Sequence, residues 1–194
     1  MSEKVTAEML IAAYMNGYFP MPHPDTDELV WFHPNPRAII PLDRFCVSRS
    51  LRRSIRKYGF SFTINQAFSD VMKGCAARSD TWINGEIFEL YTALQRLGFC
   101  YSVEVWRDGV LAGGLYGVTI GGAFFAESKF HNVTDASKAA LWHLVEHMKA
   151  RGMSLLEVQF ITPHLQSLGA IEVTTQTYME KLEQALLQNT KFLP

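Results

Sequence analysis

Two turn signals divide residues 101–127 into three segments, and this division constrains the fold more than any other feature of the chain. Asp108-Gly109 separates 101–107 from 110–119, and Gly121-Gly122 separates 110–119 from 123–127. Asp-Gly and Gly-Gly pairs favour the left-handed backbone conformations that tight hairpin turns require. Because the first segment also alternates apolar and polar side chains, the sequence predicts three consecutive antiparallel strands, a meander.

The meander is followed by a helix and a further strand. Apolar residues recur at helical spacing over 136–149, and Thr134 or Asp135 is suited to cap this helix. The apolar run 155–161 then predicts a strand that a crossover connection returns to the sheet, which gives an α+β fold. The remaining expected elements are helices at 6–15, 48–58, 67–77, 86–97 and 178–187, strands at 37–41, 60–64 and 172–175, and an irregular proline-rich loop at 20–36.

Length and charge limit the kinds of function that this chain can have. Its 194 residues suit a single domain, 1–194, with an N-terminal lobe at 1–60 and a core at 61–194. A net charge of −1 provides no general positive field, so contact with a nucleic acid must come from a local basic patch. The uncharged stretch 110–126 is too short and too rich in glycine for a membrane-spanning helix.

Cysteine usage argues against metal and redox sites. The three cysteines, Cys46, Cys75 and Cys100, lie far apart, and no Cys-x-x-Cys motif occurs. Free thiols suit a reducing cytosol, and the first residues do not form an apolar signal segment. We therefore expect a cytoplasmic protein that binds no metal and no membrane.

Four arginines lie on one face of the expected helix 48–58. Arg49, Arg52, Arg53 and Arg56 recur three and four residues apart, a spacing that gathers them on one side. Like charges at this spacing repel each other, so the cluster gives the helix no structural advantage. The pattern favours binding of a phosphate-bearing partner. The alternative is a solvated face whose arginines pair with carboxylates elsewhere in the fold.

Two tryptophans and one carboxylate are further candidates for binding. Trp31 and Trp82 stand outside the apolar stripes of the expected helices, where they are available to stack on bases or sugars. Packing over the core as a lid is the alternative for each tryptophan. Glu127 ends an apolar strand, so its carboxylate needs a hydrogen-bond donor or a cation. It binds an ammonium group or holds another side chain in place; the alternative is a structural ion pair, with Lys129 or with an arginine.

The apolar run 155–161 carries two polar residues, Glu157 and Gln159. Residues two apart on a strand share a face, so both side chains are expected on one side, where they need partners or a function. His164 is isolated and is interpreted as structural, and no Ser-His-Asp arrangement is present. Such a site suits a substrate that is already activated. It needs positioning, removal of a proton from an amine and stabilisation of an oxyanion.

Many segments, taken in order, resemble the leucyl/phenylalanyl-tRNA–protein transferase family. The resemblance extends over nearly the whole chain, and no single motif decides it. The segments that carry it are Gly17-Tyr18-Phe19-Pro20, Trp31-Phe32-His33-Pro34-Asn35-Pro36-Arg37, Ser48-Arg49-Ser50-Leu51-Arg52-Arg53, Thr81-Trp82-Ile83, Ser102-Val103-Glu104-Val105-Trp106, Gly113-Gly114-Leu115-Tyr116-Gly117-Val118, Glu127-Ser128, Ala136-Ser137-Lys138, Gln159 and Ser167-Leu168-Gly169-Ala170.

The resemblance implies a GNAT-like acyltransferase core, made of the meander, the helix and the following strand, with a reduced N-terminal lobe. It implies transfer of leucine or phenylalanine, with methionine as a further donor, from aminoacyl-tRNA to the N-terminal arginine or lysine of an acceptor protein. The extended N-terminus marks the acceptor for degradation by the cytosolic ClpAP system. Because the donor ester is already activated, we expect no cofactor, and we expect a monomer.

The family also implies roles for individual residues of this chain. The implied catalytic residues are Gln159, Glu157 and Glu127. Gln159, held by Glu157, helps the acceptor amine to lose its proton, and Glu127 contacts the aminoacyl group. Leu115, Phe124 and Met148 line the aminoacyl pocket, Trp31 and Trp82 hold the terminal adenosine, and Arg49, Arg52, Arg53 and Arg56 bind tRNA phosphates.

Four features differ from the family's pattern. The family's Asp-x-Gln is Glu157-Val158-Gln159 here, Glu-Ser-Met-Phe is Glu127-Ser128-Lys129-Phe130, Arg-x-x-Tyr is Thr175-Gln176-Thr177-Tyr178, and the N-terminal lobe is shorter than in longer members. These differences keep open a catalytically weakened paralogue that binds tRNA or N-terminal degron peptides without transfer. The other alternative is an acyl-CoA-dependent enzyme, but 130–135 lacks the glycine-rich loop that pyrophosphate binding requires.

Overall fold

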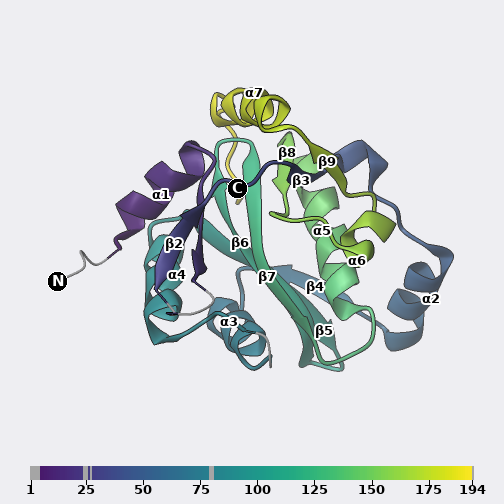
Figure 1. Ribbon diagram of the computed structural model, residues 1–194. Helices are drawn as coiled ribbons and strands as arrows, with labels where there is room; N and C mark the ends of the chain where they lie inside the picture. Colours follow the sequence, from purple (N-terminus) through teal and green to yellow (C-terminus); the bar gives the residue numbers. More distant parts are fainter. Residues whose placement is uncertain (1–4, 24–25, 27, 79–80, 194) are drawn as a thin grey trace.

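A seven-stranded mixed sheet forms the centre of the computed structural model, which describes residues 5–23, 26, 28–78 and 81–193 (Figure 1). The strands follow the order β4-β5-β6-β7-β8-β3-β9, and every neighbouring pair is antiparallel except β7 and β8. The predicted meander is confirmed as β5 (Cys100–Arg107), β6 (Val110–Ile120) and β7 (Ala123–His131). Helix α5 (Ala136–Ala150) is the crossover to β8 (Leu155–Glu157). The other strands are β4 (Ser61–Ile64), β3 (Arg37–Ile40) and β9 (Ile171–Val173).

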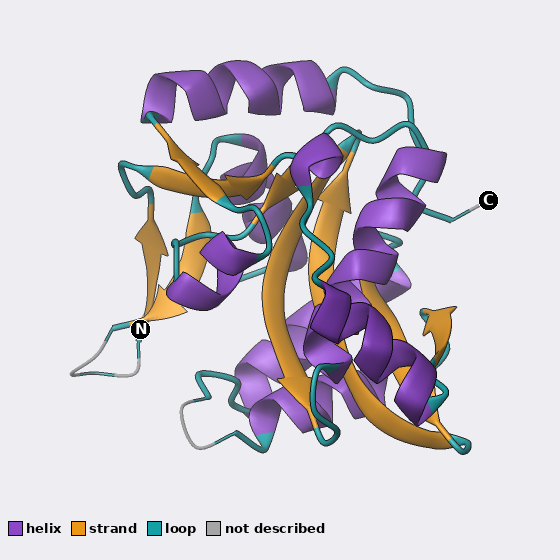
Figure 2. Cartoon of the chain, turned by 90° about the vertical axis from the view of Figure 1, so that its right-hand side faces the viewer, coloured by secondary structure: helices purple, strands orange, loops and turns teal. Residues whose placement is uncertain are grey.

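The sheet separates two hydrophobic cores. Neighbouring residues of β7 show the division, because Phe124 packs into one core and Phe125 into the other. The Phe124 side is covered by α5 and α2 (Arg49–Tyr58), and the Phe125 side by α1 (Ala7–Met15), α3 (Phe68–Ala76), α4 (Gly85–Arg96) and α7 (Thr175–Leu186). The long strands of the meander curve through the middle of the molecule, and α7 lies at one end of them (Figure 2).

Most helices begin and end at residues suited to capping. Ser48 accepts a hydrogen bond from the backbone N–H of Leu51 and begins α2, and Gly59, in the left-handed conformation, ends it. The prediction for α5 was wrong in its detail. Asp135 does occupy the cap position, but its carboxylate makes no capping bond; it contacts Lys138 and Ser54 instead.

The irregular loop expected at 20–36 is in part a hairpin, so that prediction was wrong. Strands β1 (Phe19–Pro22) and β2 (Leu29–Phe32) pair antiparallel. A two-stranded ribbon has two free edges, so a proline whose missing N–H faces such an edge interrupts no ladder hydrogen bond. The hairpin is held down by Phe19, which is fully buried and stacks on Phe32 with ring centroids 6.1 Å apart.

The strand predicted at 155–161 is shorter, and the shared face predicted for Glu157 and Gln159 is wrong. Strand β8 ends at Glu157, and Gln159 has a φ of 65°, in the left-handed region. The backbone of Ala38 bonds to both Val158 and Gln159, so the chain bends around the neighbouring strand instead of continuing straight. A short helix that the sequence did not predict, α6 (Pro163–Ser167), follows this bend.

The first 60 residues contribute directly to the central sheet. Strand β3 lies between β8 and β9, so the expected lobe at 1–60 and core at 61–194 share one sheet. Within the described part of the chain, no helix combines the length and the apolar character that a membrane span requires.

Candidate active site

A β-bulge places Glu127 at the centre of the site. In the pairing of β6 with β7, Gly117 lies opposite Ala126 and Tyr116 lies opposite Ser128, so Glu127 is an extra residue on its strand. Such an insertion redirects the side chains that follow it. Its carboxylate points toward α1 and α4, and the next residues resume the alternation with Lys129 opposite Leu115.

The carboxyl group of Glu127 forms a closed ring of contacts with two tyrosine hydroxyls. The Tyr14 hydroxyl lies 2.6 Å from Oε1, the Tyr91 hydroxyl lies 3.0 Å from Oε2, and the two hydroxyls are 2.7 Å apart. Three such contacts need three protons, and the two hydroxyls supply two. A protonated carboxyl supplies the third. In agreement with this count, burial raises the pKa of Glu127 to about 8, against the lowering effect of the tyrosine hydrogen bonds.

This raised pKa predicts a specific dependence of stability on pH. The unfolded chain releases the Glu127 proton near pH 4.5, whereas the folded protein keeps it up to about pH 8. The free energy of unfolding therefore falls as the pH rises between these values, by at most about 1.4 kcal/mol per pH unit from this group. We expect Glu127→Gln to remove this slope in denaturant titrations at several pH values, while the exposed control Glu146→Gln keeps it. Equal slopes in Glu127→Gln and the unaltered protein would contradict a protonated Glu127.

An ion pair between Arg37 and Glu157 lies behind the site, and both side chains are almost completely buried. Arg37 Nε donates to Glu157 Oε1 at 2.8 Å, and Nη1 donates to the backbone oxygen of Gly17 at 2.9 Å. The guanidinium group is also held between the rings of Phe19 and Tyr178, 4.6 and 4.5 Å from their centroids. Burial raises the pKa of Glu157, and the positive charge of Arg37 opposes that rise.

Gln159 is held between the two carboxyl groups. Its backbone N–H donates to Glu157 Oε1 at 2.6 Å, and its Nε2 donates to Glu127 Oε2 at 3.3 Å. The structure thus brings Glu127, Glu157 and Gln159 together. Glu157, which is fully buried, acts on Gln159 through the backbone, and the side chains of Gln159 and Glu127 reach the pocket.

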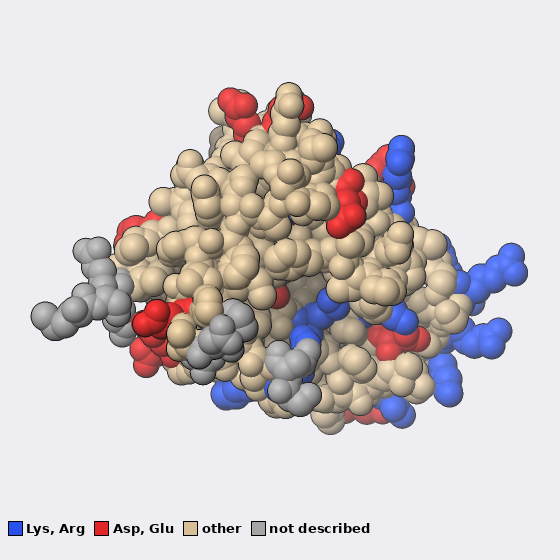
Figure 3. All heavy atoms as spheres, viewed as in Figure 1, with Lys and Arg blue, Asp and Glu red and all other residues tan. Residues whose placement is uncertain are grey.

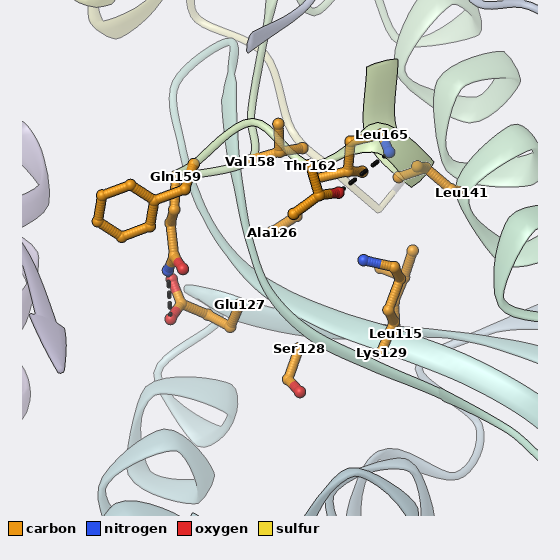
Figure 4. A pocket seen from close by; sticks show the side chains of 11 residues that line it. Leu115, Ala126, Glu127, Ser128, Lys129, Leu141, Val158, Gln159, Thr162 and Leu165 are labelled. Carbon is orange, nitrogen blue, oxygen red and sulfur yellow. Dashed lines mark hydrogen bonds between the residues drawn. The ribbon is translucent and has the colours of Figure 1, made fainter. Parts of the chain in front are cut away.

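A mostly apolar pocket opens beside Gln159 and Glu127 (Figure 4). Its volume is about 210 Å³. The predicted pocket residue Leu115 is on its wall, but Phe124 and Met148 are not. Both are fully buried in the same hydrophobic core as Leu115, away from the pocket wall. The remaining apolar wall, which the sequence reasoning did not identify, is formed by Ala126, Leu141, Val158 and Leu165.

A lysine amine points into this apolar pocket. Lys129 is on the wall, and Figure 4 shows its nitrogen directed into the pocket, on the side away from Gln159. Burial lowers the pKa of Lys129, and the nearby positive charge of Arg78 lowers it further. Within the described residues Lys129 forms no ion pair, so the pairing of Glu127 with Lys129 considered above does not occur. Glu127 is partnered by hydroxyl and amide groups instead.

The two tryptophans lie in different surroundings. Trp82 is half-buried and meets Tyr91 edge-on, with ring centroids 6.1 Å apart. Tyr91 in turn contacts Glu127, so it links Trp82 to that carboxyl group. Trp31 is 38% exposed and faces a separate hollow with Met9 and Tyr18. The structure therefore connects Trp82 to the pocket and does not bring Trp31 to its wall.

The four arginines of α2 are exposed along one groove of the surface, as the spacing predicted. None of them forms an ion pair with a carboxylate in the parts of the chain that are described, which argues against the alternative of a neutralised structural face. Basic side chains project on the right-hand side of the molecule, where α2 lies (Figures 1 and 3).

Comparison with known proteins identifies the family. Residues 39–183 match the family model described as leucyl/phenylalanyl-tRNA protein transferase, and residues 3–35 match the model of the N-terminal domain of the same proteins. The chain belongs to the leucyl/phenylalanyl-tRNA–protein transferase family. Among curated members, it is 48% identical over 190 residues to the protein of Ruegeria sp. (strain TM1040), covering 97% of this chain and 90% of that one. It is 52% identical over 188 residues to the protein of Rhodopseudomonas palustris (strain HaA2), covering 94% and 84%.

Solved structures show how this transferase-family chain compares in fold. A crystal structure of FemX is similar with a TM-score of 0.53 at 11% identity, covering 93% of this chain and 73% of that one. A GCN5-related glucosamine N-acetyltransferase region of a fungal multi-domain enzyme is similar with a TM-score of 0.51 at 9% identity, covering 89% and 22%. These similarities concern the fold, and they agree with a GNAT-like arrangement of a mixed sheet and helices.

Besides the apolar wall residues, the sequence reasoning missed three polar site residues of this transferase-family chain. Arg37 begins a strand whose other residues are all apolar, and Tyr14 and Tyr91 lie on the buried stripes of their helices. A charged or hydroxyl group within an otherwise apolar stripe requires a buried partner, and that requirement was the available signal.

Proposed function

We propose that this chain transfers leucine or phenylalanine from aminoacyl-tRNA to the N-terminus of an acceptor protein and forms a peptide bond. The observation that carries the proposal is the match of family models to 3–35 and 39–183, together with a Gln159 amide fixed at the mouth of an apolar pocket. The donor side chain occupies this pocket, which discriminates by volume, at about 1–3 kcal/mol per methylene. Phe124 and Met148, buried in the same core as Leu115, are proposed to influence the shape of this pocket through the core packing.

The reaction requires an acceptor nitrogen that has lost its proton. A neutral amide is a poor base, so Gln159 orients the acceptor and does not deprotonate it. Its Nε2 donates to Glu127, and its Oε1 is left to accept a hydrogen bond from the acceptor amine. An α-amino group has a pKa of about 8, close to the raised pKa of Glu127, so transfer of a proton between the two groups costs little free energy. As the C–N bond forms and the ester C–O bond breaks, the nitrogen gives up a proton and the leaving 3′-oxygen takes one, with Glu127 as the relay.

The finer points of the proposal follow the family resemblance. The acceptor carries an N-terminal arginine or lysine, which is extended and thereby marked for degradation, and the enzyme is a cytoplasmic monomer with a reduced N-terminal lobe. Trp82 stacks on the terminal adenosine, supported by its contact with Tyr91. Trp31 is proposed for the same adenosine, and the α2 arginines for tRNA phosphates.

A transfer assay tests the proposed function. Leu-, Phe- and Met-tRNA are each offered with a peptide that begins with arginine, and the labelled extended peptide is measured. We expect product with leucine and phenylalanine. Binding of tRNA or peptide without any product would support the weakened paralogue instead, and product from an acyl-CoA donor would support the other alternative.

Removal of two arginines from α2 is expected to weaken tRNA binding in a salt-dependent way. For Arg49→Ala/Arg52→Ala, the slope of log K against log salt should become less steep by about 0.9 for each phosphate that the helix no longer neutralises. The control, Arg96→Ala/Lys149→Ala, removes two cations from other helices and should leave the slope unchanged. An unchanged slope in the α2 variant would refute phosphate binding by this helix.

A further inference from the structure

A second basic groove lies next to the pocket, and the roles assigned above do not use it. It is lined by four basic side chains from three parts of the chain: Arg78 just after α3, Lys129 and His131 on β7, and His164 on α6. Lys129 also lines the aminoacyl pocket, so the two cavities adjoin. Figure 3 shows a hollow near the middle of the face turned to the viewer, with basic side chains at its edge.

The basic groups of this groove are close enough to influence one another. Lys129, Lys138 and His131 all lower the pKa of His164, after the effect of burial, and Asp135 opposes them. Arg78 lowers the pKa of Lys129. Among the described residues that line the groove, none is acidic. Asp135 offsets the charges on His131 and His164 only in part, and a bound anion reduces the remaining repulsion among Lys129, His131 and His164.

The groove has a definite position relative to the other sites. On one side, Lys129 lines both the groove and the pocket. On the other side, Asp135, at the start of α5, accepts a hydrogen bond of 2.7 Å from Ser54 of α2. The groove thus adjoins the pocket through Lys129 and includes Ser137 of α5, two residues from the Asp135 that contacts α2, so a strand that touches both sites can pass along it.

We propose that this groove binds phosphodiester groups of the single-stranded 3′ end of the donor RNA, between its terminal adenosine and the duplex that α2 contacts. The proposal rests on the proposed function, because it takes aminoacyl-tRNA as the donor. It assigns Arg78, Lys129, His131 and His164 to the single strand and leaves the duplex to α2. The Lys129 amine then stands where the single strand enters the pocket.

Two RNAs that are not aminoacylated test the assignment of the groove to the single strand and of α2 to the duplex. One is an acceptor-stem duplex with the single-stranded 3′ sequence CCA, and the other is the same duplex with a blunt end. For Lys129→Met/His131→Gln, we expect the affinity for the overhang RNA to fall about threefold to tenfold toward that of the blunt duplex. The salt slope should become less steep by about 0.7 for each phosphate of the single strand that the groove no longer binds. Affinity for the blunt duplex should not change.

Controls separate this result from misfolding and from failure of the proposed function. Lys149→Met removes one exposed cation at the far end of α5 and should leave both RNAs unaffected. His131→Gln alone changes an exposed residue and should reproduce part of the effect if the double variant does not fold. Equal changes for both RNAs, or no change for either, would overturn the proposal. Because no transfer is measured, loss of the proposed activity alone would leave this result intact.

Discussion

Replacing Glu157 by alanine is expected to lower the free energy of unfolding by about 3–5 kcal/mol and to abolish transfer. The change leaves the Arg37 guanidinium without its carboxylate, in a place where both side chains are at most 1% exposed. It also removes the acceptor of the Gln159 backbone N–H. Denaturant titration measures the first effect, and leucine transfer to an arginine-initiated peptide measures the second.

A double variant distinguishes the structural effect from the catalytic one. Arg37→Met/Glu157→Leu replaces the buried ion pair with apolar side chains of similar size, so we expect most of the stability to return. Transfer should stay absent, because the backbone N–H of Gln159 then has no carboxylate to fix its position. If the double variant were both stable and fully active, Glu157 would have no part in the reaction.

Replacing Gln159 by asparagine is expected to lower kcat/KM for transfer by about 10²–10³-fold with little change in stability. Asparagine tolerates the left-handed backbone at this position better than alanine does, and its shorter amide does not reach Glu127. Steady-state kinetics with Leu-tRNA and Phe-tRNA measure the loss. The matched control is Gln166→Asn, an exposed glutamine of α6, which should behave like the unaltered chain. Turnover at the ordinary rate in Gln159→Asn would remove Gln159 from the proposed site.

The parts of the fold that local signals determine could be predicted from the sequence. Asp108, Gly109 and Gly121 all adopt positive φ, so the turns that define the meander were recognisable as residue pairs. The α2 cap at Ser48 and the exposed arginine face likewise depend on neighbours within one helix. The prediction that Glu127, Glu157 and Gln159 share one site came from the resemblance of the chain to a known family, and not from local signals.

The rest of the site depends on contacts between distant segments. Glu127 is central because one extra residue is inserted in β7 where it pairs with Tyr116 and Gly117 of β6, and no residue type in that segment indicates a bulge. Gln159 leaves the strand because of the backbone of Ala38, which belongs to the other end of the chain. Periodicity describes each segment alone, so it correctly identified polar residues in an apolar run and incorrectly extended the strand through them.

The position of β3 has a consequence for how the chain is made. This strand is synthesised early, whereas its two neighbours in the sheet, β8 and β9, leave the ribosome near the end of synthesis. Until they do, both edges of β3 are unpaired and Arg37 has no carboxylate. Contacts between such distant segments slow folding, and unpaired strands associate with other chains. A nascent or truncated chain that stops before β8 is therefore expected to be the most aggregation-prone form of this protein.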